Sequence, residues 1–180
     1  MHPSLIGALL MAAVTTAGDY AWFAFGIRHT PVAGVIHGVI LLATLGAFLG
    51  AQSRKMAIGA AGGLVAGALG ALSFYAMWSV IGWTAMFVSW ALVWIGLAAF
   101  DGLVLRRASA GNARTEEPAS THWLLRGLIA AVAGAAAFYA VSGVWTAHAE
   151  NPNYGWHFVA WLIAWWPGLA ALTFGRGERR

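Results

Sequence analysis

MAIGAAGGLVAGALGALSFYAMW, residues Met56–Trp78, is an unbroken apolar run that follows directly after Arg54 and Lys55. A helix needs about 20 predominantly apolar residues to cross a bilayer, so this run is long enough to span one. Five further runs of similar length occupy most of the remaining chain. The six predicted helices cover residues 4–27, 32–51, 56–78, 83–105, 123–145 and 156–174. The sequence therefore predicts a single all-α integral membrane domain over residues 1–180.

The composition agrees with the membrane class. Hydrophobic residues make up 61% of the chain and charged residues 9%, whereas a soluble domain carries about 25% charged residues. The net charge of +4 does not indicate nucleic-acid binding, because the basic residues flank the apolar runs. The chain contains no cysteine, so disulfides and thiolate chemistry are excluded.

The basic residues also predict the topology. Nine of the ten Lys and Arg residues lie at alternate junctions between the runs, and Arg28 alone lies on the other side. Loops rich in Lys and Arg remain in the cytoplasm. We therefore expect six transmembrane helices with both termini cytoplasmic. The usage of many Ala, Gly and Trp residues and few Lys residues indicates a bacterial inner (cytoplasmic) membrane.

An internal repeat joins the second half of the chain to its middle. Gly63–Ala76 (GLVAGALGALSFYA) resembles Gly127–Ala140 (GLIAAVAGAAAFYA), and Phe87–Trp94 (FVSWALVW) resembles Phe158–Trp165 (FVAWLIAW). The third and fourth predicted helices thus form a hairpin that recurs as the fifth and sixth. Both copies start on the same side, so the repeat is parallel, with its axis along the membrane normal.

Glycines recur at every fourth position in the second and third predicted helices. Such spacing clears one helix face and lets two backbones approach. We interpret it as packing within the chain, with a contact between subunits of a homo-oligomer as the alternative. The glycines concerned are Gly34 with Gly38, Gly46 with Gly50, and Gly59 with Gly63 and Gly67.

Asp19 and His37 are ionisable residues inside predicted spans, where each needs a partner or a function. A short turn joins their helices, and at 1.5 Å per residue both lie roughly 10 Å below the same helix ends. We therefore expect them to pair. The pair is either a hydrogen bond that locks the first hairpin or a proton-labile or ligand-binding dyad. Removing one partner should destabilise the protein more than removing both.

Histidines and carboxylates gather on the predicted external side. His37, His148, His157 and Glu150 form an alternative metal-ligand set. They lack a recognised ligand spacing, so we expect neither a metal nor another cofactor. Serines and threonines lack a paired base, so no nucleophile is indicated.

Aromatic residues inside the predicted spans form the candidate ligand-binding set. Indole rings one turn apart on one helix face either meet lipid or line an intramembrane cavity suited to a lipid-like ligand. In the repeat, Tyr75 corresponds to Tyr139 and Trp90 to Trp161. The complete candidate set is Tyr75, Trp90, Trp94, Tyr139, Trp161 and Trp165.

Two segments of the C-terminal half resemble the Insig (insulin-induced gene) family. GLAAFDGLVLRR (Gly96–Arg107) resembles the end of that family's fourth helix, where an aspartate follows an aromatic residue at the cytoplasmic end. Ser142–Arg176, with GVWT, AWLIAWWPG and a terminal Gly-Arg, resembles its last hairpin. The resemblance implies a six-helix membrane protein whose central cavity accepts a sterol or another lipid. It also implies that Asp101 is the family's inner-face aspartate.

The function expected from these features is non-enzymatic binding of a membrane lipid, either a diacyl lipid or a sterol-like molecule. Two alternatives remain at the level of sequence. One is a membrane metalloprotein or enzyme that uses the external His/Asp/Glu set. The other is a structural subunit of a membrane complex, for which the glycine faces and the tryptophans would suffice.

Overall fold

The structure, a computed structural model, describes residues 2–26, 31–106, 119–142 and 153–174. Over these ranges the secondary structure is entirely helical. The elements are α1 (Pro3–Ala24), α2 (Pro31–Ala51), α3 (Met56–Ile81), α4 (Thr84–Phe100), η1 (Asp101–Arg106), α5 (Ala119–Ser142) and α6 (Tyr154–Thr173). Each predicted range corresponds to one helix, with differences of a few residues at the ends. The fourth ends in the π-helical turn η1, a wider coil than the α-helix expected there.

Five of the described helices are long and apolar enough to cross a membrane. They are α1, α2, α3, the continuous Thr84–Leu105 segment, and His122–Val141 within α5. The all-helical, multi-pass membrane character predicted from the sequence is thus confirmed. α6 is not among the five. It carries four tryptophans and a histidine, whose side chains have polar N–H groups.

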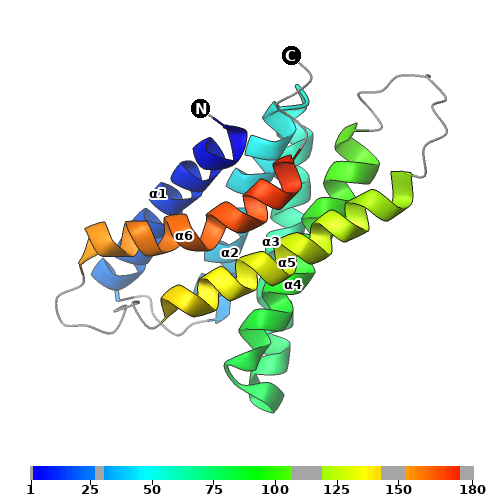
Figure 1. The fold of residues 1–180 in the computed structure, drawn as a ribbon. Coiled ribbons are helices and arrows are strands. Elements are labelled where there is room, and N and C mark those ends of the chain that lie inside the picture. Colours follow the sequence, from blue (N-terminus) through cyan, green and yellow to red (C-terminus); the bar gives the residue numbers. More distant parts are fainter. Residues whose placement is uncertain (1, 27–30, 107–118, 143–152, 175–180) are drawn as a thin grey trace.

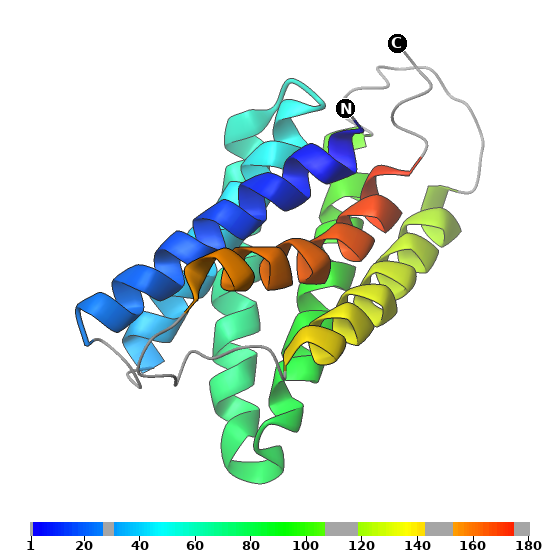
Figure 2. The same cartoon turned by 60° about the vertical axis from the view of Figure 1, so that its left-hand side comes forward.

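Neighbouring helices form a ring around the bundle in the order α1, α6, α5, α4, α3 and α2. Figures 1 and 2 show α6 lying between α1 and α5. α1 packs extensively on α6 and touches α2 only lightly, although α1 and α2 are consecutive in sequence. The first two helices therefore form only a loosely packed hairpin, and α1 packs most extensively on α6, the last helix of the chain.

The ends of the helices separate into two groups. In Figure 2 the start of α1, the turn at Gln52–Arg54 and the end of α6 lie at one end of the bundle, and the α3–α4 turn lies at the other. That second turn contains Gly82 with a φ of 54°, a left-handed conformation that glycine adopts without steric strain.

The glycine faces pack α2 directly against α3. A Cβ atom added to Gly63 would collide with the carbonyl oxygen of Leu42, and one added to Gly67 would collide with the carbonyl oxygen of Gly38. Gly46 and Gly59 meet in the same way. This confirms the predicted packing within the chain: the two backbones approach so closely that no side chain fits between them.

The buried core is concentrated in one half of the bundle, which we call the packed half. It is formed by the beginnings of α1 and α5 and the ends of α2, α4 and α6. Among its fully buried side chains are Met11, Leu45, Leu97 and Leu169. The opposite half, formed by the other ends of the same helices, is less completely filled. We call it the hollow half, and it contains the candidate site.

Candidate functional site

Asp19, near the end of α1, receives two hydrogen bonds from α6. The indole nitrogen Nε1 of Trp161 donates to Oδ2 of Asp19 over 2.7 Å. Nε2 of His157 lies 2.8 Å from the same oxygen and donates to it when its proton is on Nε2. Short bonds of this kind to a carboxylate are among the stronger ones in proteins. They connect the first and last helices of the chain.

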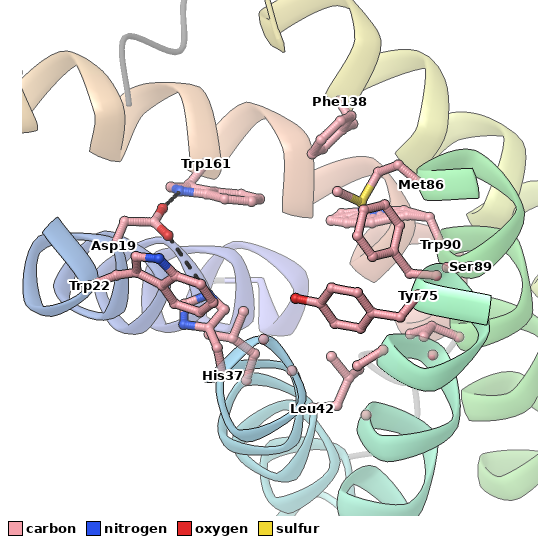
Figure 3. A pocket seen from close by; sticks show the side chains of 18 of the residues that line it. Asp19, Trp22, His37, Leu42, Tyr75, Met86, Ser89, Trp90, Phe138 and Trp161 are labelled. Atoms are coloured by element: carbon pink, nitrogen blue, oxygen red, sulfur yellow. Dashed lines mark hydrogen bonds and ion pairs between the residues drawn. The ribbon is translucent and has the colours of Figure 1, made fainter. Parts of the chain in front are cut away.

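His37 of α2 approaches the other oxygen of the carboxylate. Its Nε2 atom lies 3.7 Å from Oδ1 of Asp19, which is ion-pair distance but beyond a hydrogen bond. The ring meets Trp22 edge-on at 5.3 Å between centroids. Space for it comes from Gly18, where an added Cβ would lie 2.6 Å from Cε1 of His37. The structure thus brings Asp19 together with His37 and Trp161 (Figure 3). His157 and Trp161 are the nearer partners of the carboxylate.

A second polar contact lies one turn along the same two helices. Nε1 of Trp165 donates to the hydroxyl of Thr15 over 3.1 Å, and that hydroxyl donates to the Met11 carbonyl. Thr15 and Asp19 are four residues apart on α1, and His157, Trp161 and Trp165 are four apart on α6. The four-residue spacing places the polar groups of each helix along one face, but it does not indicate that these two faces contact each other.

A cavity of about 870 Å³ opens beside this cluster, in the hollow half. Its wall includes residues of all six α-helices, and eleven of the 25 lining residues that the structure describes are Phe, Tyr or Trp. Volumes of about 300–1,000 Å³ with mainly apolar walls and a few placed polar groups are typical of small-molecule sites. The cavity is therefore large enough to enclose an apolar ligand.

The polar groups of the cavity are few and lie close together. Asp19, His37 and His157 line one side. Figure 3 shows the Tyr75 hydroxyl pointing into the space toward that side. Gly34 lies beneath this hydroxyl, and a Cβ there would collide with it. None of the described lining residues is Lys or Arg, so the basic side chains nearest to Asp19, the only carboxylate among those residues, are His37 and His157.

Four of the six predicted ligand-binding residues line this cavity: Tyr75, Trp90, Trp161 and Trp165. Trp90 and Trp165 have ring centroids 4.9 Å apart, and Trp161 stacks on Trp165 at 6.2 Å. The Nε1 atom of Trp90 is covered by protein atoms and has no hydrogen-bond partner among the described residues.

The expected positions of Trp94 and Tyr139 are corrected. Trp94 is fully buried in the core rather than in the cavity wall. It occupies gaps at Gly134 and Gly168, where an added Cβ would collide with the indole. Tyr139 is 69% exposed on the outside of α5, so it differs from its repeat counterpart Tyr75. Helical spacing placed these aromatic residues in the repeat, but the rotation of each helix decided which way they face.

The alternative metal set is not assembled in the described part of the chain. His148 and Glu150 lie outside the described residues. Among those described, no group of three or more His, Asp or Glu residues could hold a metal ion. Asp101, the predicted inner-face residue, is only 3% exposed and begins η1 in the packed half. It is therefore far along the bundle from the polar end of the cavity.

Comparison with known proteins does not assign the chain to a group. No family model matches it, and neither a curated protein nor a solved structure does.

Proposed function

We propose that the protein is a non-enzymatic lipid-binding membrane protein that holds an apolar, lipid-like ligand in the cavity of its hollow half. The observation that carries the proposal is the cavity itself, about 870 Å³ in volume, with a mainly apolar wall rich in aromatic rings and a polar cluster around Asp19. The apolar part of the ligand would lie against the aromatic rings, where its surface is removed from water and from lipid head groups. One polar group would meet the cluster around Asp19.

The size of the cavity favours a ligand of sterol-like dimensions. Its volume lies in the upper part of the range for drug-sized molecules. A single sterol-like molecule fits within this volume, whereas the two chains of a diacyl lipid would extend beyond the cavity into the surrounding bilayer. Of the two lipid classes expected from the sequence, we therefore favour the sterol-like one.

The same proposal includes the finer architecture. We propose that α6 is the sixth membrane span and that both termini are cytoplasmic. We also propose that the membrane is a bacterial inner membrane and that the chain is Insig-like. A parallel repeat and a homo-oligomer are further expectations. The described helix ends support the topology, because the α2–α3 turn with Arg54 lies at the end where α1 starts and α6 finishes. Reporter fusions after Lys55, Ala110 and Arg180 should report cytoplasm, and fusions at Thr30 and Asn151 should report the outside. An external signal at Ala110 would contradict the six-span arrangement.

Ligand binding can be tested by filling the cavity. Met86 lines it with a flexible side chain, so Met86→Trp should occupy part of the space. Met56 is exposed outside the cavity, and Met56→Trp is the matched control. We expect lipid extracted from the purified wild-type protein and the control to contain a stoichiometric apolar molecule, identified by mass spectrometry, that Met86→Trp loses. Retention of that molecule by a folded Met86→Trp protein would contradict the proposed site.

A further inference from the structure

The charge of the cavity wall restricts the head group that a ligand can carry. Asp19 is the only carboxylate among the described lining residues, and Lys and Arg are absent from them. A phosphate or carboxylate head group near Asp19 would meet no lysine or arginine among the described lining residues, and the two nearby histidines, His37 and His157, already face the Asp19 carboxylate. Bringing like charges together in a poorly hydrated site is unfavourable. The wall therefore selects against anionic lipids.

Asp19 retains an acceptor position toward the cavity. Both hydrogen bonds from α6 end on Oδ2. Among the described residues, Nε2 of His37 lies 3.7 Å from Oδ1, and this distance is too long for a hydrogen bond. A carboxylate oxygen accepts two bonds, and the side chain remains 26% exposed. A donor on the ligand could thus approach Oδ1 directly.

Aromatic rings surround this position. Figure 3 shows Trp22, Trp161 and Tyr75 around the space next to Asp19. A cation within about 6 Å of an aromatic face is attracted by the ring quadrupole, and the attraction increases where water is excluded. The Tyr75 hydroxyl, which points into the space, adds a second acceptor. A carboxylate bordered by aromatic rings is favourable for an ammonium group.

We propose that the ligand is an amphiphile with an apolar body and a protonated amine, the amine donating to Oδ1 of Asp19 and lying beside the Tyr75 hydroxyl. This inference rests on the proposed function and specifies the ligand class of the same cavity. The amine adds a charge-assisted hydrogen bond to Oδ1 of Asp19, and the apolar body lies against the tryptophans.

A matched series of single-chain amphiphiles separates the effect of head-group charge on affinity from that of the hydrophobic chain. Dodecylamine, dodecanol and dodecanoic acid share a chain and differ in the head group. We would titrate each into the protein in phosphatidylcholine nanodiscs at neutral pH, follow the tryptophan emission, and subtract titrations of empty nanodiscs. The amine should bind about tenfold or more tightly than the alcohol, as a charge-assisted buried hydrogen bond implies. The acid should bind more weakly than the alcohol.

Two substitutions assign the effect to residues. Asp19→Asn should remove the advantage of the amine over the alcohol, whereas Glu117→Gln, which removes the same charge outside the described residues, should keep it. Tyr75→Phe should weaken amine binding by roughly two- to tenfold, and Tyr139→Phe, at the exposed repeat counterpart, should leave it unchanged. If Asp19→Asn does not fold, the wild-type affinities for the three amphiphiles and the comparison of Tyr75→Phe with Tyr139→Phe still decide whether the cavity prefers an amine.

The outcomes distinguish the two proposals. Equal affinity for amine and alcohol, tighter binding of the acid, or an amine preference that survives in folded Asp19→Asn would overturn the amine inference while lipid binding stands. If none of the three amphiphiles changes the emission beyond the empty-nanodisc control, the cavity does not bind apolar chains and the proposed function fails with it.

Discussion

The packed and hollow halves are built from the two ends of the same helices, yet they are filled differently. In the packed half, leucine, methionine and alanine side chains close the space completely, with Leu45 and Leu169 fully buried. In the hollow half, large rings such as Trp161 and Trp165 stack along the wall and leave about 870 Å³ open. Rigid aromatic rings hold helices apart unless glycines face them, as Gly134 and Gly168 face the buried Trp94. One half therefore stabilises the bundle, and the other is available for a ligand.

The largest expected difference between the halves concerns leucines one turn apart on α2. Leu45 is fully buried in the packed half, while Leu41 borders the cavity. Leu45→Ala should lower the free energy of unfolding by about 3 kcal/mol, because a new void forms among close-packed atoms. Leu41→Ala enlarges space that already exists and should cost roughly 1–2 kcal/mol. Equal losses, measured by denaturation in mixed detergent, would contradict the distinction between the halves.

Two glycine-to-alanine substitutions test the same contrast, because each one adds a Cβ atom to a helix. The neighbour of an added Cβ at Gly63 is the backbone of Leu42, which cannot move away. At Gly34 the neighbour is the hydroxyl end of Tyr75, which borders the cavity and has room to turn. Gly63→Ala should therefore cost about 2 kcal/mol of unfolding free energy, and Gly34→Ala much less. Gly96→Ala, where an added Cβ meets nothing within 4 Å, is the control and should be neutral or stabilising. A thermal shift that is the same for all three variants would refute the proposed close approach.

The polar cluster at the border of the hollow half should show unequal coupling. Double-mutant cycles should give about 1.5–3 kcal/mol between Asp19 and His157, which share a 2.8 Å contact. Between Asp19 and His37, 3.7 Å apart, the value should stay below about 1 kcal/mol. The expectation that Asp19→Asn or His37→Leu alone destabilises more than both together stays a prediction. A coupling to His37 as large as that to His157 would reverse the ranking of the partners.

The smallest expected effect concerns the second polar contact between α1 and α6. Trp165→Phe removes the bond from Nε1 to Thr15, but the Thr15 hydroxyl keeps its bond to the Met11 carbonyl. The free energy of unfolding should fall by about 1 kcal/mol. Trp166, half exposed on the same helix, provides the control: Trp166→Phe should change stability little. Equal effects of the two substitutions would show that the hydrogen bond contributes nothing measurable.

Parts of the candidate site were accessible from the sequence. Asp19 and His37 could be paired because a short turn sets their helices antiparallel at matched depth. Tyr75, Trp90, Trp161 and Trp165 could be selected because aromatic residues within a span are unusual away from the interfaces. The hydrogen bonds from His157 and Trp161 to Asp19 were not predicted, because those residues lie more than 130 positions away along the chain. Local spacing carries no information on which distant helix comes alongside.

The sequence by itself determined the all-helical membrane class and the approximate limits of the helices, because the length of an apolar run and the positions of charges act locally on each segment. It also indicated that the glycine faces of the second and third helices pack within the chain, whereas the structure showed that these two faces pack on each other. Only the tertiary structure decided that α1 packs on α6, that Trp94 is buried while Tyr139 faces outward, and that the cavity lies beside Asp19. These features depend on the rotation and tilt of each helix, which result from the simultaneous packing of all its neighbours.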